Sequence, residues 1–348
     1  MRLSDFDYDV PRELIAQQPL DRRDLSRLMV LDRRGQTIED RQFSDIAGYL
    51  RPGDLLVAND TRVIPARLYG RKESGGWVEV FLLKELTGPS GGGHLWECLL
   101  RSKRTIEPGA VITFDSELRA CVLERTGESW LLRLSCDGEL RAALERCGMT
   151  PLPPYIRRQR GRESGGDRQS YQTVFAARDG AVAAPTAGFH FTPGLLDSLR
   201  RSGVETAFVT LHVGYGTFQP LREEEIERHR MHTERVIVSP ETADAVNRAK
   251  REGRRVIAVG TTSTRALESM ADERGRIQSG EAETGIFIYP GYSFRAVDGL
   301  VTNFHVPKSS LVLLVSAFAG REFILRAYAH AVAERYRFFS YGDAMLIV

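Results

Sequence analysis

Two different hydrophobic patterns divide this sequence, and together they limit the folds open to it. Between residues 63 and 136, short β-rich runs recur at 77–83, 94–100, 111–114, 119–124 and 130–134. Glycine-containing turn signals, such as those at 75–76, 91–93 and 127, separate these runs. Short strands at this spacing indicate a small all-β barrel or sandwich rather than βαβ units.

After Tyr171 the pattern changes to alternating strands and helices, at 206–212, 240–251, 255–260, 262–270, 283–289, 309–319 and 321–336. Such alternation favours an α/β domain. The 348 residues also exceed the size at which a single core usually stops growing. We therefore predict a larger α/β domain, built from residues 1–62 and 148–348 at both chain ends. Residues 63–147 would be inserted into it as an all-β barrel domain.

The composition excludes several classes of protein. Lys and Arg number 48 and Asp and Glu 46, so the net charge of +2 does not by itself indicate a nucleic-acid partner. The most apolar run, 310–319, is far shorter than the about 20 residues that span a bilayer. Residues 1–7 lack the apolar core of a secretory signal. We expect a cytoplasmic protein without a membrane partner.

The cysteines point to the same compartment. Cys98, Cys121, Cys136 and Cys147 lack the C-x-x-C spacing of a zinc or thioredoxin-like site. Free cysteine commonly packs as a small hydrophobic residue. We predict reduced thiols in the protein core.

An anion site is the functional interpretation of residues 255–265. An apolar strand, Gly260 and a hydroxyl-rich helix start follow one another there. Such a helix N-terminus directs free N–H groups and a positive dipole end at a carboxylate or phosphate. A plain helix cap is the alternative. The residues expected to bind the ligand are Thr261, Thr262, Ser263 and Arg265.

A second candidate motif covers residues 210–218, where a strand ends at His212 in a G-x-G turn. The turn contains Gly214, Tyr215 and Gly216, and it lacks the third glycine of a dinucleotide fingerprint. The glycines would let the backbone approach a ligand closely. Taken alone, the motif is better explained by a tight turn beside a hydrogen-bonded histidine.

Metal and hydrolase chemistry find little support. The remaining candidate histidines are His190, His229, His232 and His305, and no H-E-x-x-H or comparable cluster contains them. No G-x-S-x-G string is present. We expect neither a metal site nor a serine hydrolase.

A basic segment offers an RNA contact. Arg157, Arg158 and Arg160 lie near Tyr155 and Tyr171 in a Gly-rich stretch that we expect to form a loop. Arginines beside aromatic rings suit phosphates and unpaired bases. An ordinary solvated face is the alternative.

Together the motifs resemble one family over nearly the whole chain, the S-adenosylmethionine:tRNA ribosyltransferase-isomerases of queuosine biosynthesis. The matching strings are FDY at 6–8, LIAQ at 14–17, NDTRVIPAR at 59–67, PPYI at 153–156, YQTVF at 171–175, AAPTAG at 183–188, HVG at 212–214, GTF at 216–218, MH at 231–232, VGTTS at 259–263, TNFH at 302–305 and YGDAM at 341–345.

The resemblance implies a reaction. S-adenosylmethionine would be a consumed ribose donor, and no cofactor would be required. The acceptor would be 7-aminomethyl-7-deazaguanine at the tRNA wobble position, and the products epoxyqueuosine-tRNA, adenine and methionine. We expect tRNA and S-adenosylmethionine as partners of a monomeric enzyme.

Roles for single residues follow from what this reaction requires: a base and an acid for proton transfer, and a pocket for the methionine group. His190 and His212 are expected to transfer protons, because histidine titrates near neutral pH, with Asp343 or Glu234 assisting. Tyr171 or Tyr215 would face the sulfonium or stack on a base. The matching strings add Gly214, Gly216, Asn303 and His305 to the substrate-binding residues.

Two other functions fit part of the sequence. An S-adenosylmethionine-dependent RNA methyltransferase would use the same donor, but no glycine-rich turn with a following acidic residue is evident. A non-catalytic RNA-binding protein would need only the basic loop and the barrel. It would leave the polar strings around His190, His212, Thr262 and Asp343 without a purpose.

Overall fold

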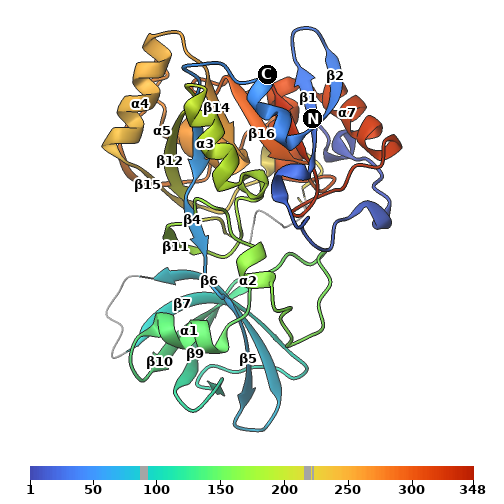
Figure 1. The fold of residues 1–348 in the computed structure, drawn as a ribbon. Coiled ribbons are helices and arrows are strands. Elements are labelled where there is room, and N and C mark those ends of the chain that lie inside the picture. Colours follow the sequence, from blue (N-terminus) through green and yellow to red (C-terminus); the bar gives the residue numbers. More distant parts are fainter. Residues whose placement is uncertain (87–92, 215–220, 222) are drawn as a thin grey trace.

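The computed structural model describes residues 1–86, 93–214, 221 and 223–348. Figure 1 shows two units joined by a narrow junction, with an α/β domain above and a β-barrel below. The predicted fold class is confirmed, because both chain ends contribute strands to the upper unit. No helix within these described ranges is long and apolar enough to cross a membrane.

A large sheet organises the α/β domain. Within the described ranges its order is β15-β13-β12-β3-β14-β16-β17-β1-β2. Strands β12, β3, β14 and β16 are mutually parallel, whereas β13 and β17 are antiparallel to their neighbours β12 and β16. The strands are β1 (Arg27–Asp32), β2 (Thr37–Gln42), β3 (Leu55–Asn59), β12 (Glu205–Leu211), β13 (Glu234–Val238), β14 (Val256–Val259), β15 (Gly280–Thr284), β16 (Gly299–Asn303) and β17 (Ala344–Ile347).

Helices cover both faces of this sheet, so its central strands β3, β14 and β16 are buried on both sides. Along β1, Met29 and Leu31 belong to one core, and Leu28 and Val30 to the other. The first core includes side chains of α4 (Pro240–Arg251), α5 (Thr261–Met270), α6 (Ser310–Ala319) and α7 (Arg321–Ala333). The second includes side chains of α3 (Pro193–Arg201) and the 3-10 helix η4 (Phe43–Gly48).

The predicted barrel is closed and antiparallel, with the order β10-β7-β6-β5-β8-β9. Alternate residues face inward, as Val80 and Leu82 do on β6, and both are fully buried. The strands are β5 (Arg67–Lys72), β6 (Trp77–Leu86), β7 (His94–Ser102), β8 (Val111–Thr113), β9 (Leu118–Thr126) and β10 (Ser129–Cys136). Helix α1 (Leu140–Cys147) packs against this core through Leu140 and Leu144.

All four cysteines are free thiols in the barrel and its helix. Only Cys98 is fully buried, whereas Cys121, Cys136 and Cys147 are half-buried. The prediction of core thiols therefore holds for Cys98 alone.

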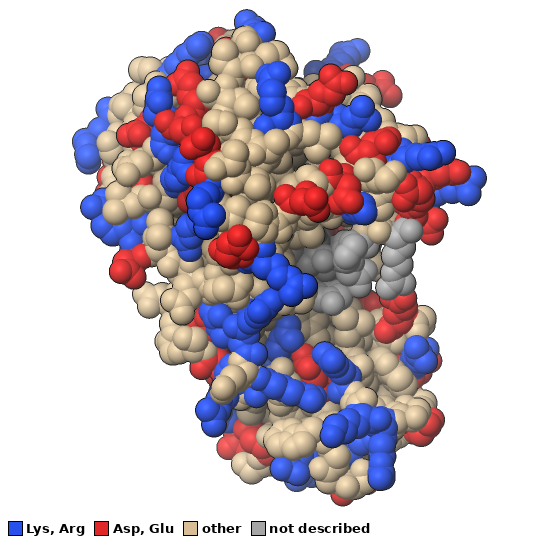
Figure 2. All heavy atoms as spheres, turned by 90° about the vertical axis from the view of Figure 1, so that its right-hand side faces the viewer, with Lys and Arg blue, Asp and Glu red and all other residues tan. Residues whose placement is uncertain are grey.

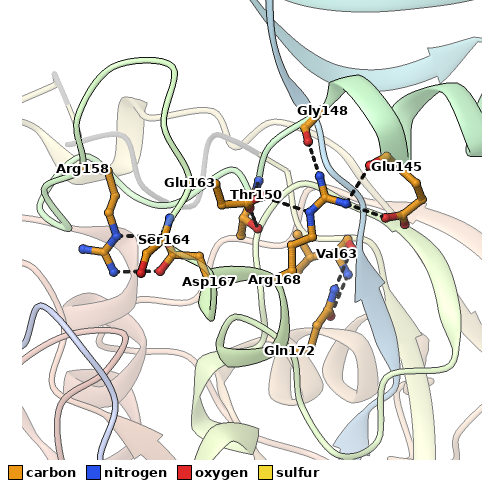
Figure 3. A network of polar contacts seen from close by, with 10 residues as sticks. All are labelled: Val63, Glu145, Gly148, Thr150, Arg158, Glu163, Ser164, Asp167, Arg168 and Gln172. Atoms are coloured by element: carbon orange, nitrogen blue, oxygen red, sulfur yellow. Dashed lines mark hydrogen bonds and ion pairs between the residues drawn. The ribbon is translucent and has the colours of Figure 1, made fainter.

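The junction between the units has an apolar cluster of its own. Short strand β4 (Thr61–Val63) continues β3 toward the barrel, and β11 (Arg178–Ala181) pairs with it in parallel. Gln172, just after α2 (Asp167–Ser170), donates to the carbonyl oxygen of Val63 at 2.7 Å and accepts its N–H at 3.1 Å (Figure 3). Tyr171 is completely buried in this cluster, so its ring offers no exposed face for stacking, contrary to expectation.

Candidate active site

Most residues singled out by their sequence context lie at one edge of the large sheet. His212 and Gly214 follow β12, Thr261 follows β14, and Asn303 ends β16. Glu234 opens the antiparallel strand β13, and Asp343 directly precedes β17, so both reach the same edge. In open α/β sheets ligands bind beyond the carboxyl ends of the parallel strands. The barrel is attached at this edge through β3 and β4 (Figure 1).

A buried ion pair joins Arg265 of α5 to Glu234 of β13. Their side chains are 4% and 5% exposed, and Arg265 Nη1 donates to Glu234 Oε2. The other carboxylate oxygen accepts the Gly214 N–H at 3.0 Å. Arg265 Nε and Nη2 are buried and have no hydrogen-bond partner among the described residues. Buried donors are almost always satisfied, so two such groups on one guanidinium indicate a place for an acceptor ligand.

The start of α5 adds further donors beside this arginine. Gly260 adopts φ +91° and caps the helix, and the first intrahelical bond runs from the Thr264 N–H to its carbonyl oxygen. The amides of the preceding residues are therefore outside the helical ladder. Thr262 Oγ1 is buried, and no residue in the described part of the chain bonds to it, whereas Ser263 Oγ donates to the Val259 carbonyl at 2.8 Å. Thr262 is thus available to a ligand, and the Ser263 hydroxyl serves its own helix.

His212 is the predicted catalytic histidine that remains accessible. Its ring is half-buried, and Nδ1 lies 2.9 Å from Thr61 Oγ1 of β4. Gly180 packs against the ring so closely that a Cβ there would approach it to 2.8 Å. Burial lowers the pKa of His212, and the neighbouring Arg235 lowers it further. The histidine is therefore neutral at pH 7 and can accept a proton.

His190 lies in a different environment. It is 3% exposed, stacks on Phe43, and borders a recess of about 20 Å³, which holds about one water molecule. Asn303 Nδ2 donates to Nε2 at 3.2 Å, so the ring proton sits on Nδ1 and is donated to Ser26 Oγ at 2.7 Å. Burial lowers the pKa of His190 to about 3. This arrangement holds a neutral, buried ring beside the recess, and the catalytic role of His190 stays a prediction.

Two further predicted residues also stabilise the fold at this edge. His305 Nε2 lies 2.7 Å from Thr302 Oγ1, and burial lowers the His305 pKa to about 3. Asp343 is 2% exposed and accepts backbone N–H groups from Arg27 and Arg337 at 2.9 and 2.8 Å. The geometry gives Asp343 and His305 bonds within the protein, and neither reaches an open surface.

The basic segment is folded back onto the junction (Figure 3). Arg158 donates to both carboxylate oxygens of the buried Asp167, at 2.8 and 2.9 Å. Arg168 donates to Glu145 Oε2 and Glu163 Oε2, each at 3.0 Å, so it ties α1 to this segment. The charge of Arg158 is therefore compensated within the protein, and its contact with RNA stays a prediction.

Of the remaining predicted residues, two are exposed arginines and two lie outside the described ranges. Arg157 and Arg160 are exposed, and the structure gives neither a carboxylate partner among the described residues. Tyr215 and Gly216 lie outside the described residues. Within the described ranges no group of His, Cys, Asp and Glu is suited to hold a metal ion. Sequence reasoning missed the two residues that hold the histidines: Ser26 lies in none of the matching strings, and Thr61 lies in the string at 59–67 but was given no role.

Comparison with known proteins identifies the family. The family model described as "Queuosine biosynthesis protein" matches residues 3–347. The chain belongs to this queuosine biosynthesis family. It is 56% identical over 348 residues to the S-adenosylmethionine:tRNA ribosyltransferase-isomerase of Geobacter metallireducens, covering 100% of both chains. A relative of the same name from Syntrophotalea carbinolica is also 56% identical, over 349 residues.

A solved member of the queuosine biosynthesis family has the same fold. The crystal structure of S-adenosylmethionine tRNA ribosyltransferase from Thermotoga maritima matches with a TM-score of 0.56 and 38% identity. The match covers 99% of this chain and 100% of that one. The similarity in fold therefore extends over nearly the whole chain.

Proposed function

We propose that this chain transfers and isomerises the ribosyl group of S-adenosylmethionine onto 7-aminomethyl-7-deazaguanine at the tRNA wobble position. The products are epoxyqueuosine-tRNA, adenine and methionine. The full-length similarity to relatives named for this activity supports the reaction class. Within the molecule, the observation that carries the proposal is the buried Arg265, two of whose N–H groups find no acceptor in the described ranges.

The methionine carboxylate of the donor binds at the start of α5. Arg265 Nε and Nη2, the Thr262 hydroxyl and the free amides of the first helical turn all offer donors there. A helix N-terminus adds a positive dipole end, which favours a carboxylate. Glu234 holds the guanidinium in place and lies near the expected position of the positively charged donor. The site is preorganised for a zwitterionic methionine group.

His212 performs the proton transfers. The reaction needs a base for the acceptor amine or for a proton beside the sulfonium, and an acid for departing adenine. A neutral imidazole can take the first proton and return it to the leaving group. Thr61 fixes the ring orientation through Nδ1, which leaves Nε2 for the substrate. No metal or prosthetic group takes part, and the enzyme acts as a cytoplasmic monomer.

The acceptor base enters from the anticodon loop, where it is reached at a lower cost than inside a duplex. Exposed Arg157 and Arg160 lie on the junction side of the barrel and contact the RNA backbone.

One incubation tests this proposal against its alternatives. The protein, S-adenosylmethionine and tRNA carrying the aminomethyl-deazaguanine should yield free adenine, free methionine and a ribose-sized mass gain on the tRNA. S-adenosylhomocysteine with a one-carbon gain would instead identify a methyltransferase. If S-adenosylmethionine stays intact although the tRNA has been verified as a competent acceptor, the result would favour a non-catalytic RNA-binding protein.

A further inference from the structure

A long groove separates the outer face of the barrel from the segment that leads back to the α/β domain. Its volume is about 790 Å³. Strands β5, β6 and β7 form one wall, through Tyr69, Phe81 and Arg101, and residues 149–163 form the other. Asp167 lines the same groove, where it pairs with Arg158. It is the first residue of α2, which leads directly to Tyr171 of the junction cluster, so the groove extends to the segment that enters the junction.

The groove carries more arginines than its ion pairs compensate, so it is positively charged. Two of its arginines are compensated, because Arg67 pairs with Glu79 and Arg158 with Asp167. No carboxylate pairs with the other four in the part of the chain that the structure describes, namely Arg101, Arg157, Arg160 and Arg162. Figure 2 shows Lys and Arg gathered over the junction and barrel on this side of the molecule.

An aromatic ring lies in the middle of these charges. Tyr69 is half-buried on the outer face of β5, and the Arg160 guanidinium stands over its ring at 5.8 Å from the centroid. A planar cation on an aromatic ring is a surface onto which an unpaired base can stack. An acidic protein partner would use the cations but would gain little from the ring. The combination therefore favours a nucleic acid.

We propose that this groove binds unpaired nucleotides of the tRNA anticodon arm, with one base stacked at Tyr69 and phosphates on Arg101 and Arg160. This proposal rests on the proposed function, because that reaction makes tRNA the acceptor. It assigns the barrel a direct part in substrate binding. A concave groove with a central ring suits a single strand better than a rigid duplex.

The first test separates stacking from charge by direct binding to the acceptor tRNA. Tyr69→Ala should weaken binding between about 5-fold and about 150-fold, the worth of one base–aromatic stack. Tyr69→Phe keeps the ring and should retain most of the affinity that Tyr69→Ala loses. The double variant Arg101→Ala/Arg160→Ala should lower the slope of log affinity against log salt by about 1.4, because two contacts to single-strand phosphates are lost.

Arg119→Ala is the matched control, because β9 lies across the closed barrel from β6. It should leave both affinity and salt slope unchanged. For the groove variants, KM for tRNA should rise while kcat and KM for S-adenosylmethionine stay constant. An unchanged affinity for Tyr69→Ala, or equal losses for Arg119→Ala and the double variant, would overturn the groove assignment.

Two outcomes distinguish the groove from the reaction itself. A wild-type protein that releases no adenine with competent tRNA refutes the proposed function. A wild-type protein that does release adenine, with Tyr69→Ala unaffected, refutes the groove alone.

In competition, a single-stranded RNA should displace the tRNA from wild type but less effectively from Tyr69→Ala, and polyglutamate should not displace it. Equal displacement by polyglutamate would overturn the choice of RNA over an acidic protein.

Discussion

Replacing Glu234 by alanine should destabilise the α/β domain selectively. The substitution leaves the Arg265 guanidinium buried and removes the acceptor of its Nη1 group. Nε and Nη2 already have no acceptor among the residues that the structure describes. Both side chains are at most 5% exposed, so water cannot replace the carboxylate without rearrangement. Removing one partner of a buried ion pair costs about 3–5 kcal/mol. We expect the free energy of unfolding to fall by that amount.

The distribution of tryptophan makes the assay specific to each domain. Trp77, Trp96 and Trp130 all lie on barrel strands, whereas α3 to α7 belong to the α/β domain. In urea, circular dichroism at the helical band should therefore show the shifted transition, and tryptophan fluorescence should keep its wild-type midpoint. An unchanged circular-dichroism midpoint would refute the buried-pair argument. A fluorescence midpoint that moves equally would show that the barrel does not unfold independently.

A second variant separates stability from function. In Glu234→Leu/Arg265→Met no charge is buried, so most of the lost stability should return. Adenine release should nevertheless stay undetectable, because the guanidinium that binds the donor carboxylate is missing. A stable, active double variant would remove Arg265 from the proposed donor site.

Three further outcomes are expected. His212→Ala should lower turnover by about 100-fold or more with little loss of stability, and full activity would exclude it from proton transfer. The pKa of His190 is about 3 in the folded state, below the ordinary 6.5. The contribution of its neutral ring to folding stability is therefore complete above pH 6.5 and is lost as the pH falls toward 3. Between pH 4 and 6, His190→Gln should reduce the pH slope of the unfolding free energy by about 1.4 kcal/mol per pH unit, and an unchanged slope would show that the ring is not held neutral. Excising residues 64–147 and bridging the ends should leave a cooperatively unfolding α/β remainder, and a non-cooperative product would contradict the predicted boundary.

The sheet edge was predictable because local signals and topology coincide there. Polar residues such as Thr261 and His212 directly follow apolar strands, and parallel strands bring their carboxyl ends together. The barrel was predictable for a similar reason, since strand spacing and glycine turns are local features. Neither inference required knowledge of long-range contacts.

Partners far apart in the chain were not predictable. Ser26, which holds His190 from 164 positions away, has no local pattern to mark it. Arg158 and Asp167 are close in sequence, but an arginine-rich segment with Gly and Ser has the composition of a solvated loop. The burial of Tyr171 becomes evident only from the junction cluster, because nothing in its neighbouring sequence distinguishes it from a surface residue. The partner of His190, the pairing of Arg158 and the burial of Tyr171 have one cause in common. Each depends on tertiary contacts, which the local composition does not show.

The position of β17 sets the order in which a growing chain can fold. This strand, formed by residues 344–347, lies between β16 and β1, so the β1–β2 hairpin has no neighbour on the sheet side until it arrives. At 5–20 residues per second, a ribosome adds residues 137 to 344 in roughly 10 to 40 s. The barrel, whose strands are complete by Cys136, can close throughout that interval. Meanwhile β1 presents unpaired backbone groups, and a premature stop before residue 344 would leave them exposed to aggregation.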